Sequence, residues 1–547
     1  MPPATRRWLI AIVLAGAALR FIPIWFGLPY PLARPDEETA VGRAVGLMSG
    51  DLNPHFFNWP SLTLYVFAIA LWVARSLETL LGEARPLTFT DSVVIARCVV
   101  ALAGTATLVV LFHLGRRVAG ERIGVLAALF LAVAILHVRD SHFAMTDVLA
   151  TLLIVTSLTY LLRAVMTDGA LSTGSVRWCA AAGLVGGLAA STKYSAAAIG
   201  ASMAAAQVLW FWATPRLMLT WRGWMPSAAY GLAMVCGFLA ATPYALLDYP
   251  AFSRDLVFEL THLSGGHAGI TLERGWTYHA THSLPYGVGV PVFIAALGGL
   301  VPFVRHYRRA AFVLGGFAGA LYLVLGSGQT VFFRYMMPLV PLVCLVAAIG
   351  VAHAAGWLSR RMHVRQAVTL VALLAITAGP SVVQSVRFDM VLGRTDTRVL
   401  ASRWLASRVR PGESLYDSGS DYTRVALRRN AVHRWTYDAA ASSFGDPAGR
   451  TPDWLVLQES PLPAYASTPP AVKALAQSNY ALVHMVRGTG PAGGSAVYDP
   501  LDAFFVPVSG FSSIERPGPD IHIYRRRDLP PIAGGRSGAG ASGSSPR

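Results

Sequence analysis

Residues 31–67 read PLARPDEETAVGRAVGLMSGDLNPHFFNWPSLTLYVF and place three consecutive carboxylates, Asp36, Glu37 and Glu38, just after a wholly apolar segment. The rest of the chain is also apolar: of its 547 residues 54% are hydrophobic and 14% are charged, and the mean hydropathy is +0.48. A charged side chain at the centre of a bilayer costs about 2.5–3.5 kcal/mol on insertion scales. We therefore expect a polytopic α-helical membrane protein whose three acids lie at an interface or in a cavity.

A search for stretches of about 20 apolar residues predicts about eleven membrane spans. They lie near residues 8–28, 92–114, 123–138, 147–165, 177–192, 195–213, 227–247, 286–304, 311–326, 332–356 and 366–386. A further apolar stretch, 61–81, decides the topology, because every later loop changes side if this stretch also crosses.

Arginine-rich loops distinguish the two topologies. The loops GRRVAGER, PRLMLTWR, RHYRR and SRRMHVR share the side of Arg6 and Arg7 only if 61–81 does not cross. Because cytoplasmic loops are enriched in Lys and Arg, we predict that 61–81 is an interfacial helix and that the N-terminus is cytoplasmic. The acids 36–38, the turn 139–147, the loop 248–285 and the whole C-terminal part then face outside.

Charge and cysteine content exclude other classes. The net charge of +16 does not indicate nucleic-acid binding, because the basic residues lie in short loops between apolar runs. The four cysteines all lie in apolar segments, which predicts neither a disulfide framework nor a cysteine metal site.

A first span that continues to Leu28 favours an uncleaved segment, although Ala15-Gly16-Ala17 leaves a cleaved signal peptide open. Abundant Ala, Gly and Arg with almost no Lys indicate a bacterial plasma (inner) membrane.

The composition changes near residue 388. The stretch DTRVLASRWLASRV has the periodicity of an amphipathic helix, and ESLYDS, DWLVLQES, YALVHMVRG and DIHIYRRRD are typical of short strands. We therefore predict a transmembrane domain over 1–387, a small extracytoplasmic α/β domain over 388–527, and a disordered tail over 528–547.

Acids at two predicted outer ends are candidates for catalysis. Asp36 and Glu37 begin a helical pattern, and Asp147 begins a span. N-capping of a helix explains each acid separately, with Thr146 as a competing cap for Asp147. If the two ends converge on one outer cavity, the carboxylates suit general-base catalysis or binding of a divalent cation.

Two cations and a histidine-containing loop lie on the same predicted side. Lys193 is the only lysine between Met1 and Val472, and Arg334 begins a span at its outer end. Either can anchor the chain at the interface, or can bind a lipid phosphate, for which Arg is well suited. The spacing of the histidines in HLSGGHAGITLERGWTYHATH matches no compact zinc motif, so a mobile loop over a cavity is favoured.

Together these stretches resemble the GT-C membrane glycosyltransferases. The resembling group includes protein O-mannosyltransferases, the aminoarabinose transferase of lipid A, and bacterial relatives that use polyprenyl-phosphate sugars. The resemblance covers roughly residues 8–410 and rests on five stretches in the expected order: PDEE, NWPSLTLY, HFAMTDVLATLL, GLAASTKYSA and FRYMMPLVPL. The GGHAG loop, with His267, also looks like one in bacterial members. Many members have HPP or YPP where this chain has Asn58-Trp59-Pro60, so no contact is carried over to that first position.

The resemblance implies a role for each candidate residue. It implies that Asp36 is the catalytic base, that Glu37 helps to hold the acceptor, and that Asp147 is the second acid of the site. It further implies that Lys193 and Arg334 contact the donor phosphate.

The implied activity is transfer of a sugar, with inversion, from a polyprenyl-phosphate donor to an extracytoplasmic hydroxyl of a glycan, lipid or protein. A divalent metal ion, held by Asp36 and Asp147, is left open. The alternatives are a multipass transporter or lipid-linked-sugar flippase, which would place ionisable groups near mid-span, and a non-catalytic membrane assembly or sensor protein.

Overall fold

The computed structural model describes residues 1–82, 86–166, 171–267, 269–270, 272–427, 432–446, 449–490 and 496–530. They form two compact units: Met1–Arg394 with Gly493–Ser513, and Thr395–Ala492 with Ile514–Arg547. The first unit ends close to the predicted boundary at 387. Residues 496–513, which the sequence assigns to the C-terminal domain, pack with the first unit instead. The tail predicted over 528–547 lies outside the described residues except for 528–530.

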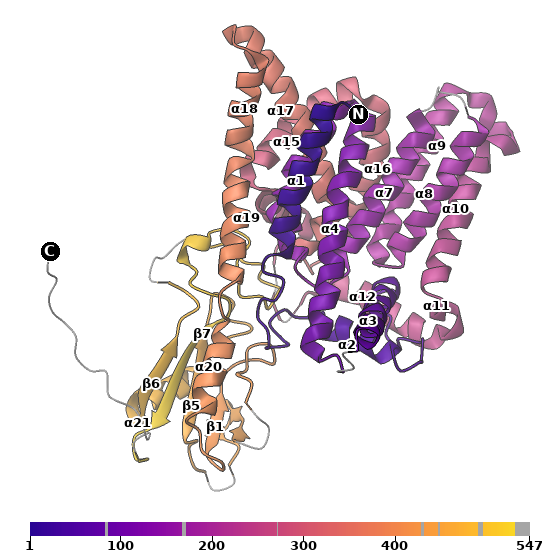
Figure 1. Cartoon of the computed structure of the whole chain (residues 1–547). Coiled ribbons are helices and arrows are strands. Elements are labelled where there is room, and N and C mark those ends of the chain that lie inside the picture. Colours follow the sequence, from indigo (N-terminus) through magenta and orange to yellow (C-terminus); the bar gives the residue numbers. More distant parts are fainter. Residues whose placement is uncertain are drawn as a thin grey trace. The chain divides into compact units, whose positions relative to one another are not determined.

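The first unit is helical, and each segment predicted to span is helical over most of its length (Figure 1). Its first helices are α1 (Pro3–Phe21), α2 (Glu37–Leu47), α3 (Leu62–Leu80), α4 (Phe89–Ala119), α5 (Glu121–Ala132), α6 (Ile135–Asp140), α7 (Asp147–Met166), α8 (Thr173–Ala190), α9 (Gly200–Ala213) and α10 (Trp221–Ala241). The later ones are α11 (Tyr244–Leu247), α12 (Tyr249–Gly265), α13 (Gly275–Tyr278), α14 (Leu284–Val288), α15 (Val290–His306), α16 (Arg308–Gly326), α17 (Val340–Met362), α18 (Gln366–Thr377) and α19 (Gly379–Leu392). Short 3-10 or π segments are η1 (Tyr194–Ile199), η2 (Pro215–Leu219), η3 (His279–Ser283) and η4 (Phe333–Leu339).

The described helices confirm a multi-pass membrane protein. Seven of them are long and apolar enough to cross a membrane, or nine if each of two bent pairs counts as one span. The predicted number of about eleven leaves out α3 and adds three helices: α1, with its three arginines, α5, which has only 12 residues, and α8, which has 18. Helix α3 passes the same length and hydropathy test. Figure 1 nevertheless shows α3 nearly end-on, across the direction of α4 and α7, which is the direction expected of an interfacial helix.

Local sequence fixes where the longest helix begins and ends. At the start of α4 the Thr88 hydroxyl accepts a hydrogen bond from the Asp91 amide (3.2 Å), and the Asp91 carboxylate accepts one from the Thr88 amide (2.9 Å). This capping box satisfies two backbone donors that the helix itself cannot pair. The last turn carries Arg116 and Arg117, which complement the helix dipole, and Gly120 ends the helix at a φ of 90°.

Small residues allow two spans to pack backbone against backbone. A Cβ atom added at Gly187 of α8 would lie 2.1 Å from the Met234 carbonyl oxygen of α10, and one at Gly183 would lie 2.2 Å from the Tyr230 carbonyl oxygen. Helices in a membrane associate through such close packing, because lipid tails are as apolar as the side chains. The glycines of α8 therefore specify its contact with α10.

The second unit is a small α/β domain, as the sequence predicts. Its helices are α20 (Thr397–Ala406) and α21 (Pro470–Asn479), and its strands are β1 (Ser414–Asp417), β2 (His433–Trp435), β3 (Tyr437–Asp438), β4 (Ser443–Phe444), β5 (Trp454–Glu459), β6 (Tyr480–Val486) and β7 (Asp520–Arg526). Five strands form a mixed sheet in the order β2-β1-β5-β7-β6, with β1 parallel to its two neighbours and β7 antiparallel to its own. The four predicted strands correspond to β1, β5, β6 and β7, and the predicted amphipathic helix corresponds to α20.

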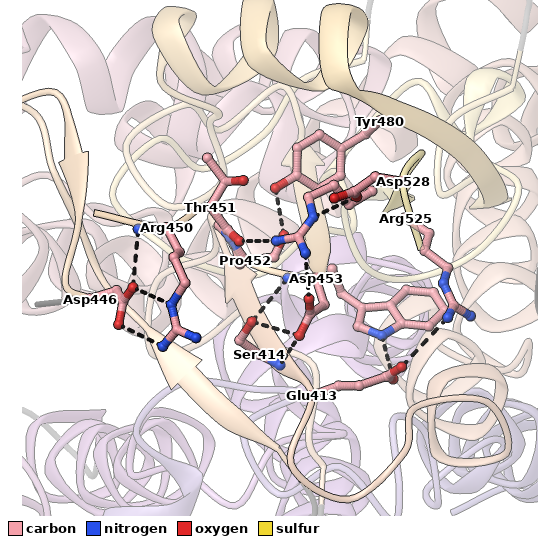
Figure 2. Close-up of polar contacts among 12 residues, drawn as sticks. Glu413, Ser414, Asp446, Arg450, Thr451, Pro452, Asp453, Tyr480, Arg525 and Asp528 are labelled. Atoms are coloured by element: carbon pink, nitrogen blue, oxygen red, sulfur yellow. Dashed lines mark hydrogen bonds and ion pairs between the residues drawn. The ribbon is translucent and has the colours of Figure 1, made fainter. Parts of the chain in front are cut away.

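Polar contacts at one end of this sheet hold β1 and β5 in register (Figure 2). The Asp453 carboxylate accepts hydrogen bonds from the Ser414 amide (2.8 Å) and the Ser414 hydroxyl (2.9 Å). The Glu413 carboxylate accepts one from the Trp454 indole (2.8 Å) and lies 3.6 Å from the Arg525 guanidinium of β7. These contacts explain why polar residues border a buried strand at this end.

Candidate active site

Asp36 has an unusual backbone conformation at the start of α2. It occupies the N-cap position with a φ of 73°, in the left-handed region, and its side chain makes no capping hydrogen bond. A non-glycine residue in this region costs on the order of 1 kcal/mol or more, and such residues concentrate at functional sites. The carboxylate is therefore directed to another partner, and simple N-capping does not explain this residue.

That partner is Arg334, at the start of η4. An Arg334 guanidinium nitrogen (Nη2) lies 3.2 Å from Asp36 Oδ2, and the two side chains are 12% and 30% exposed. The guanidinium carbon lies 4.1 Å from the centroid of the Phe332 ring, which holds the arginine by a cation–π contact. The other terminal nitrogen, Nη1, is buried and has no hydrogen-bond partner among the described residues.

Asp147 and Lys193 form a second acid–cation pair. Asp147 is the first residue of α7 and is almost fully buried, and its carboxylate pairs with the Lys193 ammonium. Lys193 also lies over Tyr335, with its nitrogen 4.9 Å from the ring centroid. Tyr335 follows Arg334 in η4, so this short helix supplies the cation of the first pair and a ring that contacts the cation of the second.

The two pairs belong to one cluster. The charges of both Asp36 and Asp147 act on Arg334, as expected of groups that share a poorly solvated region. Four of the predicted site residues, from four segments of the chain, are thus brought together: Asp36, Asp147, Lys193 and Arg334.

Glu37, the next residue after Asp36, makes different contacts. Its carboxylate accepts two hydrogen bonds from Arg97 (2.8 and 2.6 Å) and a third from the Ala144 amide (2.7 Å). Both side chains of the ion pair are 1% exposed. With its oxygens occupied inside the bundle, Glu37 is placed to support the site, and the expected contact with an acceptor is not favoured.

Glu38, the third consecutive acid, is only partly satisfied. Its Oε2 atom is buried and has no hydrogen-bond partner among the described residues. Burial, with the nearby charges of Asp36 and Glu37, raises the pKa of Glu38 to about 7, although a backbone hydrogen bond and the charge of Arg34 act to lower it.

The 262–267 region lies beside the same cluster. The His267 ring packs edge-to-face on Phe332 (5.0 Å between centroids), the ring that also holds Arg334, and on His262 (5.3 Å). Burial lowers the pKa of His267, and the neighbouring charges of His262 and Arg334 lower it further. His267 is thus close enough to the arginine to contact a ligand bound there.

A half-buried acid of α12, Glu259, is not among the site residues predicted from the sequence. Burial raises the pKa of Glu259, which accepts a hydrogen bond from the Asn58 amide (3.4 Å) and responds to the charges of Lys193 and Arg334. Its sequence context, DLVFELTHL, is that of an ordinary amphipathic helix, so no local signal marks it.

A metal site is not evident among the described residues, which contain no group of three or more His, Cys, Asp or Glu side chains arranged to hold an ion. Asp36 and Asp147 each have a cationic side chain as partner. The positive charge that a divalent ion would bring is therefore already supplied to each carboxylate.

Comparison with known proteins bears on the family and the fold. Residues 87–241 match the family described as dolichyl-phosphate-mannose-protein mannosyltransferase. No curated protein matches the chain.

Solved structures share the fold at low sequence identity. ArnT from Cupriavidus metallidurans, bound to undecaprenyl phosphate, is 16% identical, with 94% of this chain and 98% of that chain covered and a TM-score of 0.50. The archaeal oligosaccharyltransferase AglB from Archaeoglobus fulgidus, in complex with an inhibitory peptide and a dolichol-phosphate, is 13% identical, with 74% and 58% covered and a TM-score of 0.50. This chain therefore spans little more than half the length of AglB. The fold is that of the GT-C membrane glycosyltransferases, as the sequence resemblance predicted.

Proposed function

We propose that the protein is an integral-membrane glycosyltransferase that moves a sugar from a polyprenyl-phosphate-linked donor to an acceptor hydroxyl, with inversion at the anomeric carbon. Its proposed location is a bacterial plasma (inner) membrane, with the N-terminus cytoplasmic and the cluster around Asp36 facing outside. The positive-inside distribution of arginines supports this orientation. The structures reported above are transferases by name, so they lend no support to the transporter alternative.

The observation that carries the proposal is the incomplete hydrogen bonding of the Arg334 guanidinium. One of its terminal nitrogens binds Asp36, and the other is buried without a partner among the described residues. A buried guanidinium nitrogen with no acceptor is costly, and a phosphate oxygen is the acceptor that arginine binds best. A phosphate at this point would lie directly beside the carboxylate that is proposed as the base.

The chemistry follows from this arrangement. Asp36 accepts the proton of the acceptor hydroxyl while the hydroxyl oxygen attacks the anomeric carbon of the sugar. The new carbon–oxygen bond forms as the bond from that carbon to the phosphate oxygen breaks. The electron pair leaves with polyprenyl phosphate, whose additional negative charge is stabilised by Arg334 and Lys193. Attack opposite to the leaving group inverts the anomeric centre.

The acid–cation pairs also suit a donor that arrives from the membrane. A polyprenyl chain keeps the donor in the bilayer, so its phosphate has to be bound where the spans end. Asp147 would hold Lys193 in place before the donor binds, and the 262–267 region, with His267, would contact the sugar or the phosphate. The sugar and the acceptor are left open.

The test uses the full chain, purified in detergent, with a panel of undecaprenyl-phosphate monosaccharides. Release of undecaprenyl phosphate is measured for the wild type, for Asp36→Asn, and for Asp421→Asn. Asp421 is 85% exposed and, among the described residues, forms an ion pair with Arg424 alone, so it controls for the chemical change itself. We expect release by the wild type and by Asp421→Asn, and loss of release in Asp36→Asn.

A parallel measurement with EDTA determines whether a divalent cation takes part. If no donor of the panel is bound or cleaved by the wild type, with and without candidate acceptors, the proposal is wrong. If Asp36→Asn retains full release, the transferase assignment stands and the assignment of the base is wrong.

A further inference from the structure

Residues 496–510, here called the insert, belong to the first unit, although the chain up to Ala492 and again from Ile514 belongs to the second. The insert is closed at its base by a bridge in which the Val497 amide donates to the Ser509 carbonyl (2.9 Å) and the Val508 amide donates to the Val497 carbonyl (2.7 Å). Between these points the chain is buried, with Leu501, Asp502 and Val506 at most 2% exposed. A loop that is buried on this scale is unusual, because loops ordinarily cover the surface.

Asp502 is the charged centre of the insert. Its two carboxylate oxygens bind different arginines: Oδ1 lies 2.7 Å from the Arg34 guanidinium, and Oδ2 lies 2.9 Å from the Arg139 guanidinium. Both arginines are 1% exposed. Both buried positive charges are therefore compensated by one carboxylate that comes from a distant part of the chain.

The two arginines lie at the edges of the candidate site. Arg34 is two residues before Asp36, and Arg139 lies at the end of α6, eight residues before Asp147. Arg139 also binds the neighbouring Asp140 (2.7 Å). Asp502 thus ties together the two chain segments that supply the two acids of the site.

A third contact reaches the segment that supplies Arg334. The Asp499 carboxylate accepts a hydrogen bond from the Phe333 amide (2.8 Å), at the first residue of η4. Phe333 directly precedes Arg334, so this bond fixes the backbone from which the arginine extends.

Aromatic packing reinforces the charged contacts. The Phe504 ring lies 4.9 Å from the Phe143 ring, which is in the turn before Asp147. The guanidinium carbon of Arg34 lies 4.7 Å from the centroid of Phe143, and that of Arg139 lies 5.1 Å from the centroid of Phe504. The arginines are held by carboxylates and ring faces together, which leaves them little freedom to move.

From these contacts we infer that the insert is a positioning element of the active site, and that Asp502 and Asp499 fix the segments that carry Asp36, Asp147 and Arg334. Ordinary core packing would require only apolar contacts. Here the insert places one carboxylate between the two acid-bearing segments and another on the arginine-bearing segment. A displacement of about 1 Å in a reacting group can reduce turnover by about 100-fold.

The first test is hydrogen–deuterium exchange on the full chain in detergent, and it does not depend on the proposed function. Asp502→Asn is compared with the wild type, with Asp502→Glu, and with Val506→Ala, which removes buried packing from the same insert. We expect faster exchange in Asp502→Asn in the segments 31–47 and 139–150, with recovery in Asp502→Glu. We expect Val506→Ala to change exchange within the insert alone.

The second test is kinetic, and it rests on the proposed function. With a donor that the wild type cleaves, Asp502→Asn is expected to lower kcat about 100-fold and to leave KM for the donor within about threefold. At matched thermal stability, Val506→Ala is expected to keep a kcat within about threefold of the wild type. A structural role alone would lower kcat only in proportion to the loss of folded protein.

The two tests separate the two proposals. If exchange in 31–47 and 139–150 is the same in Asp502→Asn and in the wild type, the positioning inference is wrong, whatever the chain catalyses. If exchange increases there but no donor is ever cleaved, the inference stands for these segments and the proposed function is wrong. If Asp502→Asn does not fold, Asp499→Asn replaces it, with increased exchange expected in 330–340.

Discussion

Asp36 and Glu37 are adjacent in the chain, yet their carboxylates lie in opposite environments. Glu37 forms a bidentate ion pair with Arg97, and both side chains are 1% exposed. Asp36 makes a single contact of 3.2 Å with Arg334, and the two side chains are 30% and 12% exposed. Both carboxylate oxygens of Glu37 are already hydrogen-bonded. The Asp36–Arg334 pair leaves one carboxylate oxygen and one guanidinium nitrogen to bind other partners among the described residues or a ligand.

The difference shows how a run of acids divides into structural and chemical roles. A fully satisfied buried pair is costly to disturb and is hard to use for proton transfer. A partly exposed carboxylate that is held by one hydrogen bond can exchange a proton with a bound hydroxyl. Burial and the number of hydrogen bonds, rather than position in the motif, therefore distinguish the two acids.

The largest expected effect is on turnover in Asp36→Asn. Loss of a general base typically lowers the rate by about 10²- to 10⁴-fold, and the thermal stability should change little because this side chain makes only one contact. The paired measurement is single-turnover release of polyprenyl phosphate and thermal unfolding of the same samples. A large loss of thermal stability in Asp36→Asn would show that Asp36, like Glu37, has a structural role.

The next effect is on stability in Arg97→Met. This substitution leaves the Glu37 carboxylate buried without its cation, which costs about 3–5 kcal/mol. We expect a lower unfolding temperature, whereas Arg177→Met, on an exposed position of α8, should leave that temperature unchanged. Equal stability of the two variants would show that the Glu37–Arg97 pair is not structural.

A smaller effect is expected on lipid binding in Arg334→Lys. Lysine keeps the charge but cannot bind Asp36 and a phosphate through two separate nitrogens. A hydrogen bond to a charged group is worth about 1.5–3 kcal/mol, so binding of undecaprenyl phosphate should weaken roughly 10- to 100-fold. Native mass spectrometry or a lipid-binding titration measures the affinity for undecaprenyl phosphate, with Arg177→Lys as the control. Unchanged affinity would place the phosphate elsewhere.

The smallest effect concerns the pH dependence of stability in Glu38→Gln. Because burial raises the pKa of Glu38 to about 7, its contribution to stability is complete below its unfolded pKa of about 4.5 and is lost as pH rises through about 7. The variant lacks this loss, so it should gain stability relative to the wild type between pH 5 and pH 8. Thermal unfolding across this range measures the effect, and the exposed Glu273→Gln should show none.

Much of the fold was predictable because the bilayer imposes strong rules on sequence. Apolar runs located the helices of the first unit, and alternation and turn residues located β1, β5, β6 and β7. The predicted number of spans, about eleven, is larger than the seven to nine that helix length and hydropathy give. Short or arginine-bearing segments such as α5 and α1 are apolar runs in the sequence but do not meet both criteria as single helices.

The candidate site was predictable in part. Acids and cations beside spans are expensive, which singled out Asp36, Asp147, Lys193 and Arg334. The different environments of Asp36 and Glu37 were not predictable from the sequence. They depend on Arg97, which lies inside an apolar span and binds Glu37, 60 residues away in sequence. An arginine at such a position signals a buried acid, but does not identify which of three consecutive acids it binds.

The insert could not be found from local pattern at all. Asp499 and Asp502 lie in YDPLDAFF, within a region whose composition is that of the small α/β domain. Only their long-range partners, Arg34, Arg139 and Phe333, give them a role. Contacts over such sequence separations leave no periodic signal.

The position of the insert in the chain also sets an order of assembly during synthesis. Asp502 follows Arg334 by 168 residues (502 − 334), so it leaves the ribosome after every other charged residue of the cluster. At about 5–20 residues per second this interval lasts roughly 8 to 34 s. During that time the spans can enter the membrane while Arg34 and Arg139 still lack their shared carboxylate. The ion pairs that join the segments of Arg34 and Arg139 can therefore form only after residue 502 has been added.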